Sequence, residues 1–361
     1  MKKFLNKKIT IILTIIILLL IAKLHIIKKE KALSTSNMNH IVVYGSLREE
    51  EGKYLLEKFK NEYDCTYEYI KLPTEEAVQR ILDTRDNPQG DIFIGGSCDG
   101  YEILKKYDAL EEYNSPLANN IPAKYKDLRG YWTGFQITPL SIGINKSLWQ
   151  TYFGDSVPYP KKIEDLLNPE FKDKIILPNP QTSGTGYTLM ASLYQELGKE
   201  KFEAFIAKLN DNVSSSTISG FNSIQRVASG EYLITINFLS DQLIANRSSD
   251  NIISIVPENA GWNIDSIALI KNSKHEKIAK SFIDFVLSKE TSSDLSKFSK
   301  AISTKNFDTN QFKIYDKYNF YLAAEDREKI MQILYNLNNN NLYVSEIYLI
   351  KIIGLKLIKI S

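Results

Sequence analysis

The chain has 361 residues, of which 43% are hydrophobic and 24% are charged, so it is long enough for two globular domains or one large one. A net charge of +2, without a basic stripe interleaved with aromatic residues, gives no electrostatic case for a nucleic-acid partner. With only two cysteines, Cys65 and Cys98, the chain is not a disulfide scaffold; the two could pair or remain free.

The N-terminus has the pattern of an export segment. Four lysines precede an apolar run at residues 9–22, and no small-x-small cleavage site follows it. We therefore expect a signal peptide or an N-terminal membrane anchor over residues 1–29 and a polar linker over 30–39, with an uncleaved anchor slightly favoured. Either reading places the rest of the chain outside the cytoplasm, in the periplasm or at the cell surface.

Strands and helices alternate in the next part of the chain, which predicts a mainly parallel sheet. Each expected strand ends in a turn or at the start of a helix. The expected strands are 41–44, 65–72 and 91–94, and the expected helices contain 55–63, 75–82 and a segment from about 101.

Residues 130–145 form a long β segment, which we interpret as a strand that crosses between two lobes. A second alternating region follows it. Strands are expected at 175–177, 232–238, 252–256 and 266–270, and helices at 163–167, from 182, around 202–209, at 278–287 and at 323–337.

Three turns share one design, in which a strand is followed by small residues and a helix. They are Gly45-Ser46, Gly95-Gly96-Ser97 and residues 182–186, which include Ser183, Gly184 and Thr185. Backbone amides, hydroxyls and helix dipoles at such turns attract anions, although each turn alone could be a tight connection with a capping serine. Three such turns favour a shared anion-binding cleft.

Catalytic and metal-binding signatures are missing from the sequence. The three histidines, His25, His40 and His275, are not placed as bases, and no Gly-Lys-Ser/Thr phosphate loop or zinc spacing occurs. The sequence therefore predicts a protein that is not an enzyme, with no cofactor and no metal site.

From residue 41 to 337 the chain resembles the extracellular solute-binding proteins of ABC importers, in the branch named for ferric-iron binding. The specific segments are DIFIGGSCDGY, ILPNPQTSGTGYT, ASGEYLITINF and FIDFVLSKE. The resemblance implies an α/β, two-lobed type II periplasmic-binding-protein fold with a mainly parallel sheet in each lobe and a hinge of crossing strands. It implies an N-terminal lobe at 40–137 and 264–340 and a C-terminal lobe at 138–263. The apolar tail at 341–361 is given no role.

The resemblance also bears on the ligand. Ferric-binding members hold the metal with adjacent tyrosines after the strand that ends here at Phe238, whereas this chain has Ser240-Asp241 and no adjacent tyrosines. It is closer to the sub-branch that binds phosphorylated sugars and organophosphonates, in which Asp241 would contact the organic part. The expected ligand-binding residues are Ser46, Gly95, Ser97, Ser183, Gly184, Thr185, Asp241 and Glu258, while Arg48 either assists or is a solvated helix residue.

The resulting hypothesis is the solute-binding component of an ABC importer, with a small anionic ligand, permease subunits as membrane partners and a monomeric state. Two alternatives stay open at this point. One is a ferric-iron or other metal receptor, and the other is an anchored sensor protein of a two-component system.

Overall fold

The computed structural model describes residues 23, 39–305 and 312–337. Apart from Lys23, the expected N-terminal segment lies outside these residues, and so does the tail at 341–361. Within the described ranges, no helix is both long and apolar enough to cross a membrane.

The first group of strands is parallel, with β1 between β2 and β3, and a helix follows each strand. Its elements are β1 (His40–Gly45), α2 (Glu49–Tyr63), β2 (Thr66–Lys71), α3 (Thr74–Asp83), β3 (Ile92–Ile94) and α4 (Cys98–Lys106). The helices form because apolar residues recur at helical spacing, and the face carrying Leu55, Leu56 and Phe59 is buried against the strands.

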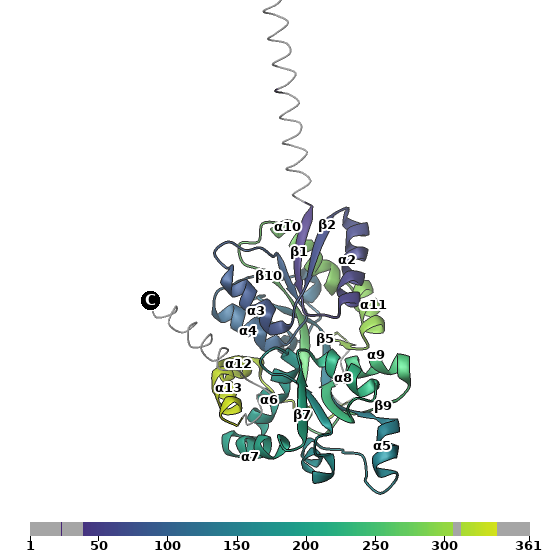
Figure 1. The fold of residues 1–361 in the computed structure, drawn as a ribbon. Coiled ribbons are helices and arrows are strands. Elements are labelled where there is room, and N and C mark those ends of the chain that lie inside the picture. The colour runs from purple at the N-terminus through teal and green to yellow at the C-terminus, as the bar shows by residue number, and fades with distance from the viewer. Residues whose placement is uncertain (1–22, 24–38, 306–311, 338–361) are drawn as a thin grey trace, which may run out of the picture.

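A second parallel group, in the order β8-β6-β7, repeats this design. Its elements are β6 (Ile175–Pro178), α6 (Gly184–Leu197), α7 (Lys199–Leu209), β7 (Val213–Thr217), α8 (Gly220–Ala228), β8 (Ile234–Phe238) and α9 (Leu239–Ser249). Figure 1 shows β1 and β2 at one end of the molecule and β7 at the other, with β5 between them.

The long strand β5 (Thr133–Asn145) joins the two groups, as expected of a crossing strand, and all of its residues are buried. Its first half pairs with β10 (Trp262–Ile270), and its second half pairs with β8. The short strands β11 (Ile302–Ser303) and β9 (Ile252–Ile255) also pair with β5, and β4 (Leu110–Glu111) pairs with β10.

These pairings make one mixed sheet in the order β2-β1-β3-β10-β5-β8-β6-β7. The expected mainly parallel sheet in each lobe is seen in the outer strands, and the expected crossing strands are β5 and β10. These two strands pair antiparallel, so the structure has one mixed sheet where two separate sheets were expected. The physical reason is that β5 carries the chain from the first group to the second and β10 carries it back. Two neighbouring strands that cross in opposite directions pair antiparallel.

The remaining described helices cover the outside of the sheet. They are α5 (Lys146–Phe153), α10 (Glu276–Leu287), α11 (Lys289–Ser299), α12 (Phe320–Glu325) and α13 (Arg327–Asn336), with short 3-10 turns η1 (Pro116–Ala118), η2 (Ala123–Tyr125), η3 (Ile163–Leu167) and η4 (Pro169–Phe171). The single helix expected at 323–337 is two helices separated at Asp326, and the helix expected at 163–167 is a 3-10 turn. Cys65 and Cys98 are both buried and free.

One buried carboxylate ties β1 to the segment before α10. Asp91 accepts hydrogen bonds from the backbone N–H of Val42 (2.7 Å), from Ser273 Oγ (2.7 Å) and from the backbone N–H of His275 (3.2 Å). Its Oδ2 atom also lies 2.9 Å from Nδ1 of His275. The carboxylate therefore satisfies donors from two separate segments, β1 and residues 273–275.

We predict that Asp91→Ala lowers the free energy of unfolding by about 3 kcal/mol, because several buried donors lose their acceptor together. Chemical denaturation followed by circular dichroism measures this loss. Glu203→Ala is the control, since Glu203 makes only a 3.8 Å surface pair with Lys199 and its removal should change stability by less than about 0.5 kcal/mol. Equal effects of the two substitutions would show that the Asp91 network contributes no more than a surface pair.

Candidate functional site

A cavity of about 340 Å³ lies where the two strand groups meet. Each of the six parallel strands ends beside it, and so does the start of the helix that follows each strand. Residues of the first turn line the cavity in α2, α3, α6, α8 and α9, and Ser97, which directly precedes α4, lines it as well. The N-termini of helices carry unpaired amides and a partial positive charge. Where no carboxylate lies beside such a helix start, it attracts negative charge without requiring a basic side chain.

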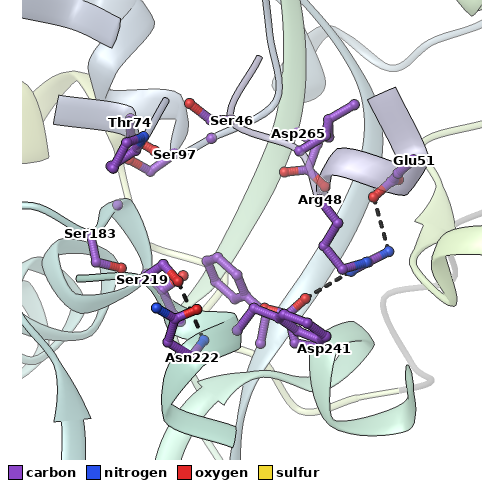
Figure 2. A pocket seen from close by; sticks show the side chains of 18 of the residues that line it. Ser46, Arg48, Glu51, Thr74, Ser97, Ser183, Ser219, Asn222, Asp241 and Asp265 are labelled. Carbon is purple, nitrogen blue, oxygen red and sulfur yellow. Dashed lines mark hydrogen bonds and ion pairs between the residues drawn. The ribbon is translucent and has the colours of Figure 1, made fainter. Parts of the chain in front are cut away.

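Small hydroxyl residues begin the helices on one side of the cavity, which we call the hydroxyl side. Ser97, Ser183 and Ser219 precede α4, α6 and α8, and Thr74 begins α3. The side chain of Ser183 accepts from the backbone N–H of Gly186, and that of Ser219 accepts from the N–H of Asn222. In Figure 2 these side chains face one another across the cavity.

Two glycines allow the helix starts to approach this closely. A Cβ atom on Gly184 would lie 2.5 Å from Ser97 Oγ and 2.7 Å from Thr74 Oγ1, and one on Gly220 would lie 2.5 Å from Thr185 Oγ1. Contacts this short exclude any larger residue unless the helices separate. Gly184 thus brings α6, from the second strand group, against α3 and α4 from the first.

The hydroxyl of Ser97 stands out on this side. The residue is 1% exposed and lines the cavity, yet its Oγ atom makes no hydrogen bond of good geometry within the described residues. It lies near the Asp99 carboxylate, which it helps to stabilise in the charged form. A buried hydroxyl without a well-placed partner is costly unless a ligand or water supplies one.

The opposite side of the cavity is acidic and is built around Arg48. The guanidinium of Arg48 contacts Asp241 Oδ1 at 2.8 Å and Glu51 Oε2 at 2.9 Å. Asp265 also lines the cavity and has no ion-pair partner among the described residues. One guanidinium therefore pairs with two carboxylates, as Figure 2 shows, and a third, Asp265, lies beside them. Lys71 also lines the cavity and is exposed.

Burial changes the ionisation of these carboxyl groups. It raises the pKa of Glu51 to about 7 and raises the pKa of Asp241, in both cases against the lowering effect of Arg48. The pKa of Asp265 lies well above its usual range, first because of burial and then because Glu51 and Asp241 are near. The acidic side therefore favours a group that donates hydrogen bonds or carries positive charge.

The structure brings together six of the eight expected ligand-binding residues. Gly95 lies directly behind the cavity, where its N–H donates to Ser266, and Glu258 is elsewhere on the surface, paired with Lys313. The residues that line the cavity are Ser46, Ser97, Ser183, Gly184, Thr185 and Asp241.

Sequence reasoning missed several lining residues. Ser219-Gly220 repeats the strand, small-residue turn and helix pattern after β7, and this signal was available in the sequence. No local sequence pattern marks Asp265, because it lies inside strand β10 and is brought to the cavity by the tertiary fold. The sequence left two roles open for Arg48, a residue that assists ligand binding or a solvated helix residue. The structure places it in the wall of the cavity.

The described residues contain no group of three or more His, Cys, Asp or Glu side chains arranged to hold a metal ion. The pocket defines a class: open α/β proteins with a ligand-sized cavity at the carboxyl ends of two sets of parallel strands. The chain belongs to the family of bacterial extracellular solute-binding proteins, whose model matches residues 87–325. It is a solute-binding protein and not an enzyme.

Individual relatives agree with this family. The periplasmic binding protein AfuA from Actinobacillus pleuropneumoniae, solved with fructose-6-phosphate bound, superposes with a TM-score of 0.77 at 26% identity, over 82% of this chain and 98% of that one. An uncharacterised Haemophilus influenzae protein is 26% identical over 83% of this chain and 90% of its own length. A putative 2-aminoethylphosphonate-binding periplasmic protein of Salmonella typhi is 23% identical over 65% of this chain and 68% of its own.

We predict that Glu51→Gln reduces the pH dependence of stability. The pKa of Glu51 is about 7 in the folded state against 4.5 as its ordinary value, so between these pH values the native state holds a proton that the unfolded state has lost. Stability should therefore fall as the pH rises from 5 to 8, with Glu51 contributing up to about 3 kcal/mol of that loss.

Denaturant titrations of the wild type and Glu51→Gln at pH 5 and pH 8 measure this contribution. The wild type should lose more stability over the interval than the variant does. Parallel losses in the two proteins would mean that Glu51 ionises in the folded state as it does in the unfolded chain.

Proposed function

We propose that the protein is the extracytoplasmic solute-binding component of an ABC importer and that it captures a small organic anion, a phosphorylated sugar or a phosphonate, in this cavity. Two relatives support the ligand class through what their names state: the AfuA structure contains fructose-6-phosphate, and the Salmonella typhi protein is described as putatively binding 2-aminoethylphosphonate. In this scheme permease subunits in the membrane receive the ligand from a monomeric receptor.

The observation that carries the proposal is the hydroxyl side of the cavity. Four helices, α3, α4, α6 and α8, begin there, and among the described residues the buried Ser97 hydroxyl has no well-placed hydrogen-bond partner, although it lies near the Asp99 carboxylate. A phosphate or phosphonate offers three acceptor oxygens and negative charge, which match amides, hydroxyls and helix dipoles. Arg48 is already bound by Asp241 and Glu51, so the helix starts provide the main attraction for the anion.

The acidic side of the cavity sets a second requirement, which is that the ligand carries hydrogen-bond donors. Asp241 in α9 and Asp265 in β10 both line the cavity, and both are acceptors when ionised. They suit hydroxyl groups of a sugar or the amine of an aminophosphonate. The cavity is therefore complementary to a molecule with an anionic end and a donor-rich end.

We further propose that the two strand groups are lobes that close on the ligand about β5 and β10. The Arg48–Asp241 pair joins the start of α2 to the start of α9 and so connects the two groups directly at the cavity. A ferric ligand is not favoured, because the cavity-lining residues in the described ranges include no tyrosine, histidine or cysteine.

A thermal-shift screen of the purified protein tests the ligand class. The compounds are sugar phosphates, aminoalkylphosphonates, inorganic phosphate, polyamines and ferric citrate. A ligand at 100 times its Kd adds about 2.7 kcal/mol, which raises the melting temperature by several degrees. We expect shifts with phosphorylated organic compounds or phosphonates; a shift with ferric citrate alone would overturn the proposal.

We predict that Ser97→Ala weakens binding of the compound identified in this screen about 10-fold to 100-fold, the effect of losing one hydrogen bond to a charged group. Ser141→Ala is the matched control. Ser141 is also fully buried with an Oγ atom that lacks a partner in the described structure, but it does not line the cavity. Isothermal titration calorimetry should give an unchanged Kd for Ser141→Ala, and equal Kd values for both variants would remove Ser97 from the site.

A further inference from the structure

A buried ionic cluster lies directly behind the hydroxyl side of the cavity, centred on Arg327 at the start of α13. Its Nη2 atom contacts Glu75 Oε2 at 2.6 Å, and its Nη1 atom contacts Asp99 Oδ2 at 2.9 Å. Glu75 is the second residue of α3, and Asp99 is the second residue of α4. A planar guanidinium can hold two carboxylates in fixed positions, so this one side chain joins the first turns of two cavity helices.

The same guanidinium contacts a third cavity helix. Its central carbon lies 3.8 Å from the centre of the Tyr187 ring, and Tyr187 is in the first turn of α6. The hydroxyl of Tyr187 in turn donates to the backbone carbonyl of Ala323 in α12. Since α6 belongs to the second strand group, Arg327 links helix starts from both groups.

The residues held by Arg327 are immediate neighbours of residues that line the cavity. Thr74 precedes Glu75, and Ser97 lies two positions before Asp99. The space that a Cβ atom on Gly184 would need is taken by Ser97 and Thr74, so α6 already touches α3 and α4 at this point. A change in the Arg327 cluster would therefore move the groups that face an anion.

Charge gives Arg327 a second effect. Glu75 and Asp99 are buried, and burial raises the pKa of each while Arg327 lowers it. Without the guanidinium, ionised carboxylates at these positions would repel an anion on the hydroxyl side. Arg327 offsets that repulsion at the ends of the helices whose dipoles attract the ligand.

We propose that Arg327 is a positioning residue for the anion-binding side of the cavity, through which the helix pair α12–α13 is coupled to ligand binding. The inference rests on the proposed function, because it assumes that an anion occupies the hydroxyl side. Figure 1 shows α12 and α13 beside α4 and α6. Three further interactions attach the pair to these helices: an ion pair of Lys106 with Glu325, and two hydrogen bonds between the side chain of Gln195 and the backbone of Asn319, which precedes α12.

The first test compares two variants by calorimetry with fructose 6-phosphate and 2-aminoethylphosphonate as probes. Arg327→Lys keeps the positive charge but cannot bridge two carboxylates and the tyrosine ring together, so Kd should rise at least tenfold. Lys106→Gln is the matched control, since it removes a more exposed ion pair that joins α4 to α12, the other helix of the α12–α13 pair. Its Kd should equal that of the wild type.

The second test uses the unaltered protein, so it stands even if Arg327→Lys does not fold. Hydrogen exchange is measured with and without a saturating probe. Binding should slow exchange in α13, which contributes no residue to the cavity lining, and leave α10, another helix outside the lining, unchanged.

The outcomes separate this inference from the proposed function. If the wild type binds neither probe, the proposed function fails, and the role of Arg327 fails with it. If the wild type binds a probe but Arg327→Lys binds equally well, or α13 exchanges at the same rate in both states, only the role assigned to Arg327 is overturned.

Discussion

Strand β5 is the constraint on which the rest of the structure depends. Its thirteen residues are all buried, and it pairs with β10 along its first half and with β8 along its second. Because β10 joins the first strand group to β5 and β8 joins the second group to it, the carboxyl ends of both groups face a common space. Six helices then start at that space, and those on the hydroxyl side offer amides and helix dipoles to an anion.

The cavity has two chemically different sides, which differ in whether they contain buried charged side chains. The hydroxyl side uses amides and hydroxyls, which need no counter-charge. The acidic side places three carboxylates near one guanidinium. The raised pKa values of Glu51 and Asp265 show that burial disfavours the charged forms of these carboxyl groups. A ligand that is negative at one end and rich in donors at the other would satisfy both sides, which is why we propose an organic anion rather than a bare ion.

The sequence predicted the regular elements well where local patterns are strong. The strand, small-residue turn and helix signal located Ser97 and Ser183–Thr185, because capping and backbone approach depend on neighbours in the chain. Reasoning from the sequence placed Glu258 at the cleft, whereas the structure pairs it with Lys313 on the surface. Helices α8 and α9 were missed, and with them Ser219, although its turn carries the same pattern.

The sequence by itself determined the family, the alternation of strands and helices, and the turns that begin α4 and α6, since these depend on residue types at short spacing. Only the tertiary structure decided that Arg48 pairs with Asp241 across 193 positions of the chain, that Asp265 faces the cavity, and that Arg327 holds Glu75 and Asp99. It also decided that the centre of the sheet is antiparallel. Contacts between distant residues depend on how β5 and β10 cross, and no local pattern contains that information.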